Sequence, residues 1–290
     1  MILIFGNIYS NINTFIDNEL ISGAQNTATQ DSMQEISGSS ALQAISAARA
    51  GGRVSIIGTV GNDLFGRNCL DIFRKEGINS SSIAKSKTGT GLEFSFSDPD
   101  NKATSIISYG ANLHTHAEQI PEINLNERTL LMLSSDSDVQ VINILLERAK
   151  ARESRSILCL DNNNKLDASI YSSADIIVSN ENIINCNSTG YIVEAINNGV
   201  YGAKLHNKEG NINNYESTPN EKIIDTKACF EVFCGFFASA IQAGLPIRRA
   251  ITLASKAAQK TSEKIGIYDS IPYLGYVQDL EKEKARNINS

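Results

Sequence analysis

The sequence predicts an α/β protein with a mostly parallel central sheet between layers of helices and a small separate β-sheet. Short apolar runs alternate with amphipathic segments along most of the 290 residues, which is typical of parallel strands joined by crossover helices. Residues 91–112 instead alternate apolar and polar side chains around the turn sequence DPDNK, which predicts an antiparallel hairpin. A chain of this length can bury a sizeable core.

The expected strands and crossover helices follow one another in chain order. The apolar runs are ILIF (2–5), RVSIIG (53–58), TLLMLS (129–134), SILCLD (156–161) and ADIIVS (174–179). The amphipathic segments are ALQAISAARAGG (41–52), LFGRNCLDIFRKEG (64–77) and VQVINILLERAK (139–150). We expect the first two of these helices to end at Gly51 and Gly77, because glycine readily takes the left-handed conformation that terminates a helix.

The last third of the chain predicts two long helices. They cover about residues 227–243 and 246–264 and are separated by AGLP, where Gly244 and Pro246 end the first and start the second. The sequence DTKAC (225–229) precedes the first helix. Ligands of open α/β sheets bind beyond the carboxyl ends of the strands, often at a helix N-terminus that favours anions, so we expect a ligand site there.

The hairpin and the polar, Asn-rich stretch 11–36 predict a small lid sheet. A core domain would then consist of 1–10, 37–88 and 112–290, and the lid of 11–36 and 89–111. A small sheet with an apolar face and exposed edges needs a cover, either a ligand or a second subunit. We therefore expect a homodimer through the lid.

Composition excludes several classes of partner. The net charge is −6 and the basic residues are scattered, which argues against nucleic acid. Apolar runs are too short for a membrane span or a signal peptide, so we expect no membrane partner and a cytoplasmic location. The five cysteines lack C-x-x-C spacing, which indicates reduced thiols, and His114 and His116 lack partners at ligand spacing, so no metal site is expected.

Six motifs stand in series along the chain. They are SGSSALQAISAARAGGRVSIIGTVGNDLFG (37–66), the hairpin with its following GAN (88–112), ADIIVSNENI (174–183), NNGVYGAKL (197–205), DTKACFEVFCGFF (225–237) and GIYDSIP (266–272). In order and spacing they resemble the signatures of the pfkB family of ribokinase-like carbohydrate kinases, closest in pattern to ribokinase. The resemblance implies a three-layer α/β/α fold with a β lid.

The same resemblance implies ATP-dependent phosphoryl transfer to a hydroxyl of a sugar or nucleoside, with Mg²⁺ and a monovalent cation as accompanying ions. In the family an Asp near the start of the second-signature helix accepts the hydroxyl proton, and neighbouring glycine amides form an anion hole. Glu231 stands at the position of this base. Ala228, Cys229 and Phe230 stand where the anion hole would be.

Further positions are carried over from the family motifs one by one. The substrate-binding positions are Asn11, Gly38, Leu42 and Ser134. The nucleotide-binding positions are Asn180, Asn197, Gly199, Gly202, Asp225, Thr226, Lys227 and Ser255.

Several of these residues depart from the family pattern. Glu231 is one methylene longer than Asp, and a displacement of about 1 Å can cost about a hundredfold in rate. If the backbone at 228–230 is left-handed, each side chain there costs roughly 1–2 kcal/mol, and Phe230 would occupy the space of phosphate oxygens. Leu42 cannot bind a hydroxyl, Ser134 stands in place of a carboxylate, and Ile183 replaces a Glu that organises Mg²⁺-bound phosphates.

Structural interpretations stand beside the functional ones. Glu231 is also favoured near a helix N-terminus without any catalytic role. Gly199 and Gly202 suit a turn between a helix and a strand, the Phe230–Phe237 aromatics suit a core, and Asp63 suits a helix N-cap. Two functions therefore remain open: a kinase whose activity is impaired or altered, acting on an unusual, less hydroxylated substrate, and a pseudokinase that binds a nucleotide, a metabolite or a protein without turnover.

Overall fold

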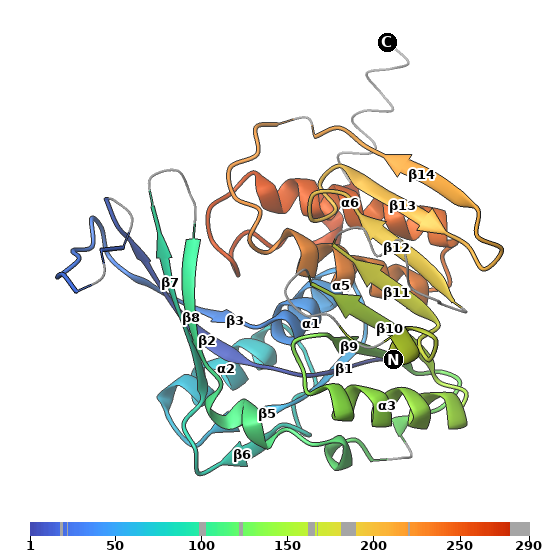
Figure 1. The fold of residues 1–290 in the computed structure, drawn as a ribbon, viewed down its shortest axis with the longest axis horizontal. Coiled ribbons are helices and arrows are strands. Elements are labelled where there is room, and N and C mark those ends of the chain that lie inside the picture. Colours follow the sequence, from blue (N-terminus) through green and yellow to red (C-terminus); the bar gives the residue numbers. More distant parts are fainter. Residues whose placement is uncertain are drawn as a thin grey trace.

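The structure is a computed structural model, and it describes residues 1–17, 20–21, 23–98, 103–121, 124–161, 166, 168–180, 190–219 and 221–278. An eight-stranded sheet, here called the main sheet, has the strand order β14-β13-β12-β11-β10-β9-β1-β4 (Figure 1). Its strands are β1 (Ile2–Phe5), β4 (Val54–Ile57), β9 (Leu130–Ser134), β10 (Arg155–Leu160), β11 (Ile176–Ser179), β12 (Tyr191–Ala195), β13 (Gly202–His206) and β14 (Ile212–Glu216).

The strands from β12 to β4 are parallel, and β13 and β14 continue the sheet in antiparallel pairing. The predicted mostly parallel sheet is confirmed, and the antiparallel end is an addition to the predicted order. Because parallel strands point the same way, their carboxyl ends share one edge of the sheet. This edge carries the candidate site.

Alternate residues of each central strand enter two different cores. Ile2 and Ile4 belong to one apolar cluster, whereas Leu3 and Phe5 belong to the other, as the period of two along a strand requires. The first cluster packs with α1 (Ser39–Arg49), α2 (Leu64–Lys75), α5 (Cys229–Gln242) and α6 (Ile247–Ser262), and the second with α3 (Val139–Ala151) and α4 (Ala168–Tyr171). Helices therefore cover both faces, and the architecture is a three-layer α/β/α sandwich.

A four-stranded sheet, here called the small sheet, stands beside the main sheet (Figure 1). Its order is β3-β2-β7-β8, with β2 (Tyr9–Phe15), β3 (Met33–Ser37), β7 (Gly91–Ser97) and β8 (Ala103–Ser108). β7 and β8 pair antiparallel, which confirms the predicted hairpin; residues 99–102 of its turn lie outside the described ranges. A two-stranded pair, β5 (Thr59–Gly61) and β6 (Ala84–Ser86), and two short 3₁₀ turns, η1 (Gly110–His114) and η2 (Ala117–Gln119), complete the described elements.

The predicted helix boundaries are confirmed within about two residues at α5 and α6. Gly51 and Gly77 follow α1 and α2 with positive φ angles of 86° and 68°, as expected for helix-terminating glycines. Asp63 is the N-cap of α2, because its Oδ1 accepts the Gly66 N–H at 2.8 Å. Its carboxylate also accepts the Thr90 N–H at 2.7 Å and the Thr90 hydroxyl at 2.6 Å, so it joins α2 to the start of β7.

A buried ion pair ties the two N-terminal helices to the segment after α6. Arg49 of α1 and Glu76, which caps α2, lie 2.7 Å apart with side chains 7% and 5% exposed. The Arg49 guanidinium also lies 4.6 Å and 4.7 Å from the ring centres of Tyr268 and Tyr273. Such contacts are stronger away from water, so this cluster fixes the C-terminal segment against α1.

The structure bears on two expectations from composition, one about the cysteines and one about membrane-spanning helices. Cys69, Cys159, Cys229 and Cys234 are free and buried, whereas Cys186 lies outside the described residues. Within the described part of the chain, no helix combines the length and apolar character that crossing a membrane requires.

Candidate functional site

A cavity of about 420 Å³ lies between the carboxyl edge of the main sheet and the small sheet. We call it the inter-sheet cavity. Its wall consists of Tyr9, Ser37, Gly38, Ser39, Leu42, Glu93, Ser95, Ser105, Ile107, Tyr109, Asp136, Asp161, Lys227, Glu231 and Ile267. The wall therefore combines strand ends, the start of α1, the region around the start of α5, and residues of the small sheet.

Glu231 lies in the first turn of α5 and is 9% exposed. Its Oε1 is 3.5 Å from the Ser39 hydroxyl, which donates to it, while Oε2 is buried without a hydrogen-bond partner among the described residues. Burial raises the pKa of Glu231 to about 8, and the nearby carboxylates of Asp161, Asp136 and Glu93 act in the same direction. The group is therefore mainly protonated at neutral pH.

Two carboxylates that the sequence analysis does not single out also line the inter-sheet cavity. Asp136 follows β9 and Asp161 follows β10. Burial raises the pKa of Asp136 to about 6, and the charge of Asp161 adds to this. The sequence carries one signal that could have identified both residues. Each is the first acidic residue after a buried apolar strand, and the carboxyl ends of parallel strands lie at one edge of the sheet.

Lys227 brings one ammonium group to the same cavity. Its Nζ donates to Ser97 Oγ on β7 at 2.7 Å, and its backbone N–H donates to Asp225 Oδ1 at 3.0 Å. Within the described ranges Lys227 forms no ion pair at 4.0 Å or less. Its charge is therefore directed toward the small sheet.

The backbone of 228–230 is not left-handed. Ala228 is the N-cap of α5 with φ −101°, and α5 begins at Cys229. Phe230 is 4% exposed and packs in the first core cluster, and it does not line the inter-sheet cavity. The expected strain and the expected obstruction by Phe230 are therefore both wrong, because a helical backbone accepts a side chain and directs this one inward.

The four predicted substrate positions fall into two pairs. Gly38 and Leu42 line the inter-sheet cavity. Asn11 and Ser134 are buried behind its wall: Asn11 Oδ1 accepts the Ser95 hydroxyl at 2.9 Å, and the Ser134 hydroxyl donates to Gln43 Oε1 at 2.9 Å. Asp136, two residues beyond Ser134, lines the cavity, whereas Ser134 does not.

Several predicted nucleotide positions are linked by hydrogen bonds through a residue that the sequence analysis omits, Asn198. Asn180 Oδ1 accepts the Asn198 N–H at 3.2 Å, and Asn198 Nδ2 donates to the Thr226 carbonyl at 3.3 Å. Asn197, Asn198 and Gly199 all have positive φ angles, of 47°, 57° and 85°. This turn joins β12 to β13, so the expectation of a turn between a helix and a strand is wrong.

Packing accounts for both glycines of this turn. A Cβ at Gly199 would meet the Phe233 ring, and a Cβ at Gly202 would meet the backbone carbonyl of Tyr215.

The last predicted nucleotide position, Ser255, lies in α6 and is 2% exposed, and its hydroxyl has no partner in the described part of the chain. Ile183 lies outside the described residues.

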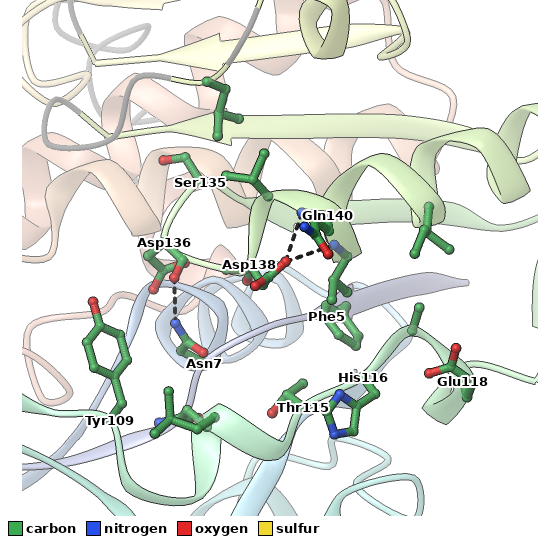
Figure 2. Close-up of a pocket in the computed structure, with 18 residues that line it drawn as sticks. Phe5, Asn7, Tyr109, Thr115, His116, Glu118, Ser135, Asp136, Asp138 and Gln140 are labelled. Carbon is green, nitrogen blue, oxygen red and sulfur yellow. Dashed lines mark hydrogen bonds between the residues drawn. The ribbon is translucent and has the colours of Figure 1, made fainter.

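A larger cavity of about 990 Å³ adjoins the site (Figure 2). Tyr109 and Asp136 line both cavities. Asn7 Nδ2 donates to the Asp136 carbonyl at 2.8 Å, which holds the turn after β9 against the end of β1. Asp136 therefore stands where the two cavities meet.

The structure is an α/β fold with a cavity of about 420 Å³ at the carboxyl edge of its main sheet, where ligands of such folds usually bind. The chain belongs to the pfkB family of carbohydrate kinases, whose sequence profile matches residues 2–274. It is 24% identical over 265 residues to a ribokinase of Schizosaccharomyces pombe, covering 82% of this chain and 83% of that one. It is 26% identical over 273 residues to a ribokinase of Lactococcus lactis, covering 87% of each.

Solved structures show the same fold. The ribokinase of Thermotoga maritima superimposes with a TM-score of 0.85 at 22% identity, covering 97% of this chain and 99% of that one. The Arabidopsis thaliana ribokinase complexed with ribose and ATP gives a TM-score of 0.81 at 18% identity, covering 96% and 97%. These structures confirm the predicted fold, and the profile match over residues 2–274 confirms the predicted family.

Proposed function

We propose that this protein is an ATP-dependent phosphotransferase that uses Glu231 as general base toward a hydroxyl of a small polar acceptor. One observation carries the proposal. The Glu231 carboxylate lines the inter-sheet cavity in the first turn of α5, with Oε2 buried and free of partners in the described part of the chain. This is the kind of placement that proton abstraction from a bound hydroxyl requires.

The surrounding residues suit phosphoryl transfer in position and charge. The N-terminal end of α5 favours the negative charge of a transferred phosphoryl group, and Lys227, two residues before this helix, adds a positive charge to the cavity wall. The linked group of Asn180, Asn198 and Thr226 offers polar atoms next to this helix end, where we place ATP. Gly38 and the serine hydroxyls of the cavity wall lie in the part of the cavity where we place the acceptor.

The described residues give a metal little direct support. Among them, no three His, Cys, Asp or Glu side chains gather closely enough to hold an ion. Mg²⁺ usually binds through substrate phosphates and only one or two carboxylates. A Mg²⁺ ion here would therefore arrive with the nucleotide, neutralise charge on its phosphates, and leave proton abstraction to Glu231.

A catalytically inactive pseudokinase is the second candidate, and one observation favours it. Because burial raises the pKa of Glu231 to about 8, the base carries a proton at neutral pH in the ligand-free protein. The same cavity could then bind a metabolite, and the small sheet a protein, without turnover.

Coupled ADP release across a panel of sugars and nucleosides separates the two functions. For an active kinase, kcat/KM rises about tenfold per pH unit toward a plateau above about pH 8, since the base must lose its proton. Glu231→Gln should abolish turnover, whereas Glu216→Gln on the exposed face of β14 should not. If no acceptor releases ADP and ATP does not raise the melting temperature, the kinase proposal fails.

A further inference from the structure

The larger cavity has no part in the proposed reaction, although it adjoins the inter-sheet cavity. Its volume of about 990 Å³ lies at the upper end of the range for small-molecule pockets, about 300–1,000 Å³. Tyr109 and Asp136 line both cavities, and both lie at the end of the larger cavity that is remote from Glu118 (Figure 2). An acceptor bound beside Glu231 therefore has room to extend past these two residues into the larger cavity.

Three apolar side chains in the wall of the larger cavity are exposed to solvent. Leu113 of η1 is 67% exposed, and Val139 and Ile144 of α3 are each 42% exposed. Exposed apolar surface that borders a cavity often marks a binding site, because its removal from water is favourable. An apolar group of the acceptor that covers these side chains would therefore raise the affinity of the acceptor.

Several polar side chains of the same wall are already hydrogen-bonded to the protein. Asn112 accepts the Ile8 N–H with Oδ1 and donates to the Ile8 carbonyl with Nδ2, both at 2.9 Å. Thr115 Oγ1 donates to Thr59 Oγ1 at 3.0 Å, and Asp138 Oδ1 accepts two N–H groups of α3 at 2.8 Å and 3.2 Å. A nucleobase needs free polar partners for its edge, so this wall suits a group without polar atoms better.

The side-chain polar atoms of this wall that are buried without a partner lie near the inter-sheet cavity. In the described part of the chain they are Asp136 Oδ1 and Ser137 Oγ, both in the turn after β9. Such atoms are stabilised when a ligand supplies the missing hydrogen bond, and a ligand hydroxyl can both donate and accept. The junction of the two cavities therefore suits the hydroxylated part of a ligand whose apolar part occupies the larger cavity.

We propose that the acceptor is a glycoside that carries an apolar aryl or alkyl substituent. Its sugar unit occupies the inter-sheet cavity with one hydroxyl directed at Glu231. Its substituent occupies the larger cavity and covers Leu113, Val139 and Ile144. For its reaction this inference rests on the proposed function, and it adds an apolar substituent to the polar acceptor proposed there.

The substituent takes no part in the bonds that change. The acceptor oxygen forms a bond to the γ-phosphorus of ATP, the bond from that phosphorus to the β,γ-bridging oxygen breaks, and ADP leaves. The hydroxyl proton passes to Glu231, and the glycosidic bond stays intact. Because the substituent makes the same contacts before and during the transfer, it should lower KM and leave kcat nearly unchanged.

Calorimetric titration of the full chain without ATP tests the inference with matched pairs of probes, the phenyl and methyl β-D-glycosides of glucose, galactose and ribose. We expect the phenyl member of at least one pair to bind at least about tenfold more tightly than its methyl partner. Burial of one methylene group is worth about fourfold in affinity, so tenfold requires only part of the ring to be covered. The methyl glycoside should compete with its phenyl partner, because their sugar units share one cavity.

Substitutions in the larger cavity should act on the substituent alone. Leu113→Gln and Ile144→Gln should each reduce the preference for the phenyl glycoside at least about threefold and leave the affinity for the methyl glycoside unchanged. Leu64→Gln is the matched control, because Leu64 is 59% exposed at the start of α2 and lines neither cavity; it should change neither affinity. Melting temperatures show whether each variant folds.

Four results would overturn the inference: no binding of any phenyl glycoside, equal binding within every pair, phenol binding as tightly as the phenyl glycosides, or tighter binding of adenosine or uridine than of every phenyl glycoside. Because binding is measured without ATP, the kinase proposal is tested separately by ADP release. A phenyl preference without ADP release would defeat the kinase proposal alone. ADP release with simple sugars but no phenyl preference would defeat only this inference.

Discussion

The Glu231 carboxylate combines deep burial with an incomplete set of hydrogen bonds. Ser39 Oγ approaches one oxygen at 3.5 Å, and the other oxygen has no partner within the described ranges. Such a group is stable only when protonated or when a ligand completes it. We therefore expect a ligand that contacts this side chain in the inter-sheet cavity to change its proton binding.

Phe230 gives a residue-scale prediction about core packing. Its side chain is 4% exposed within the core cluster that contains Phe233 and Phe237. Phe230→Ala should therefore lower the free energy of unfolding by about 3–5 kcal/mol, measured by urea denaturation, without improving ATP binding. A loss below about 1 kcal/mol together with tighter ATP binding would instead place the ring at the nucleotide site.

The sequence predicted correctly those residues whose structural role depends on their immediate neighbours in the chain. Asp63 as N-cap and Glu231 at the start of a buried helix follow from short patterns. The obstruction expected from Phe230 was wrong because its ring lies in the core cluster, and the left-handed backbone on which the expected strain depended does not occur, since the φ of Ala228 is −101°. Asp136 and Asp161 were missed because each stands in a polar run, SSDSD (134–138) and DNNNK (161–165), where the local sequence does not mark out one residue.

At the scale of elements, the Asp63 carboxylate joins α2 to β7. It accepts hydrogen bonds from the Gly66 N–H and from both the N–H and the hydroxyl of Thr90. Burial alone would raise the pKa of Asp63, but these hydrogen bonds hold it below the usual value. The stabilisation is therefore complete above the unfolded-state pKa of about 3.9 and is lost as the pH falls through the lower folded-state value.

Asp63→Ala should reduce the free energy of unfolding by about 2 kcal/mol at neutral pH, because a cap and two further hydrogen bonds are lost. The matched control is Asp138→Ala, which removes the N-cap of α3; among the described residues its carboxylate accepts hydrogen bonds from Gln140 and Val141 of its own helix alone, so its loss should cost about 1 kcal/mol. Urea midpoints measure both changes. Equal losses, or a loss at Asp63 that persists unchanged down to pH 2, would contradict the role given to Thr90.

Among the elements, strongly periodic helices and continuous apolar strands were predictable. The antiparallel strands β13 and β14 were not: INNYE of β14 is polar and largely exposed, and GAKLH of β13, although mostly buried, is a short run that begins with a glycine. Their pairing depends on the neighbouring strand β12 and not on their own pattern. The β12–β13 turn was misassigned because the element before it is a strand, Tyr191–Ala195, and not the expected helix.

At the scale of the whole molecule, the small sheet presents apolar side chains to solvent. Ile106 and Ile107 of β8 are 59% and 48% exposed, and β8 is an edge strand. Side chains alternate along a strand, and Ile107 lines the inter-sheet cavity, so Ile106 faces away from it. Exposed apolar edges favour association, which supports the proposed homodimer through this sheet.

Light scattering should therefore report a dimer, and Ile106→Lys should convert it to a monomer with at least a tenfold weaker association. Ile212→Lys is the matched control, because Ile212 is 57% exposed on β14 at the far edge of the main sheet. The control should remain dimeric. A monomeric unsubstituted protein, or equal effects of the two substitutions, would exclude this interface.

The Lys227–Ser97 hydrogen bond, at 2.7 Å, has a consequence for how the molecule moves. It fastens the segment before α5 to β7, so the small sheet cannot swing outward without breaking it. A hydrogen bond to a charged group contributes about 1.5–3 kcal/mol, so this contact opposes outward movement of the small sheet. Glu35 on β3 adds a second tether, because its Oε1 accepts the N–H groups of Ile267 and Tyr268 at 3.0 Å and 3.1 Å, and wider access to the cavity would require both to break.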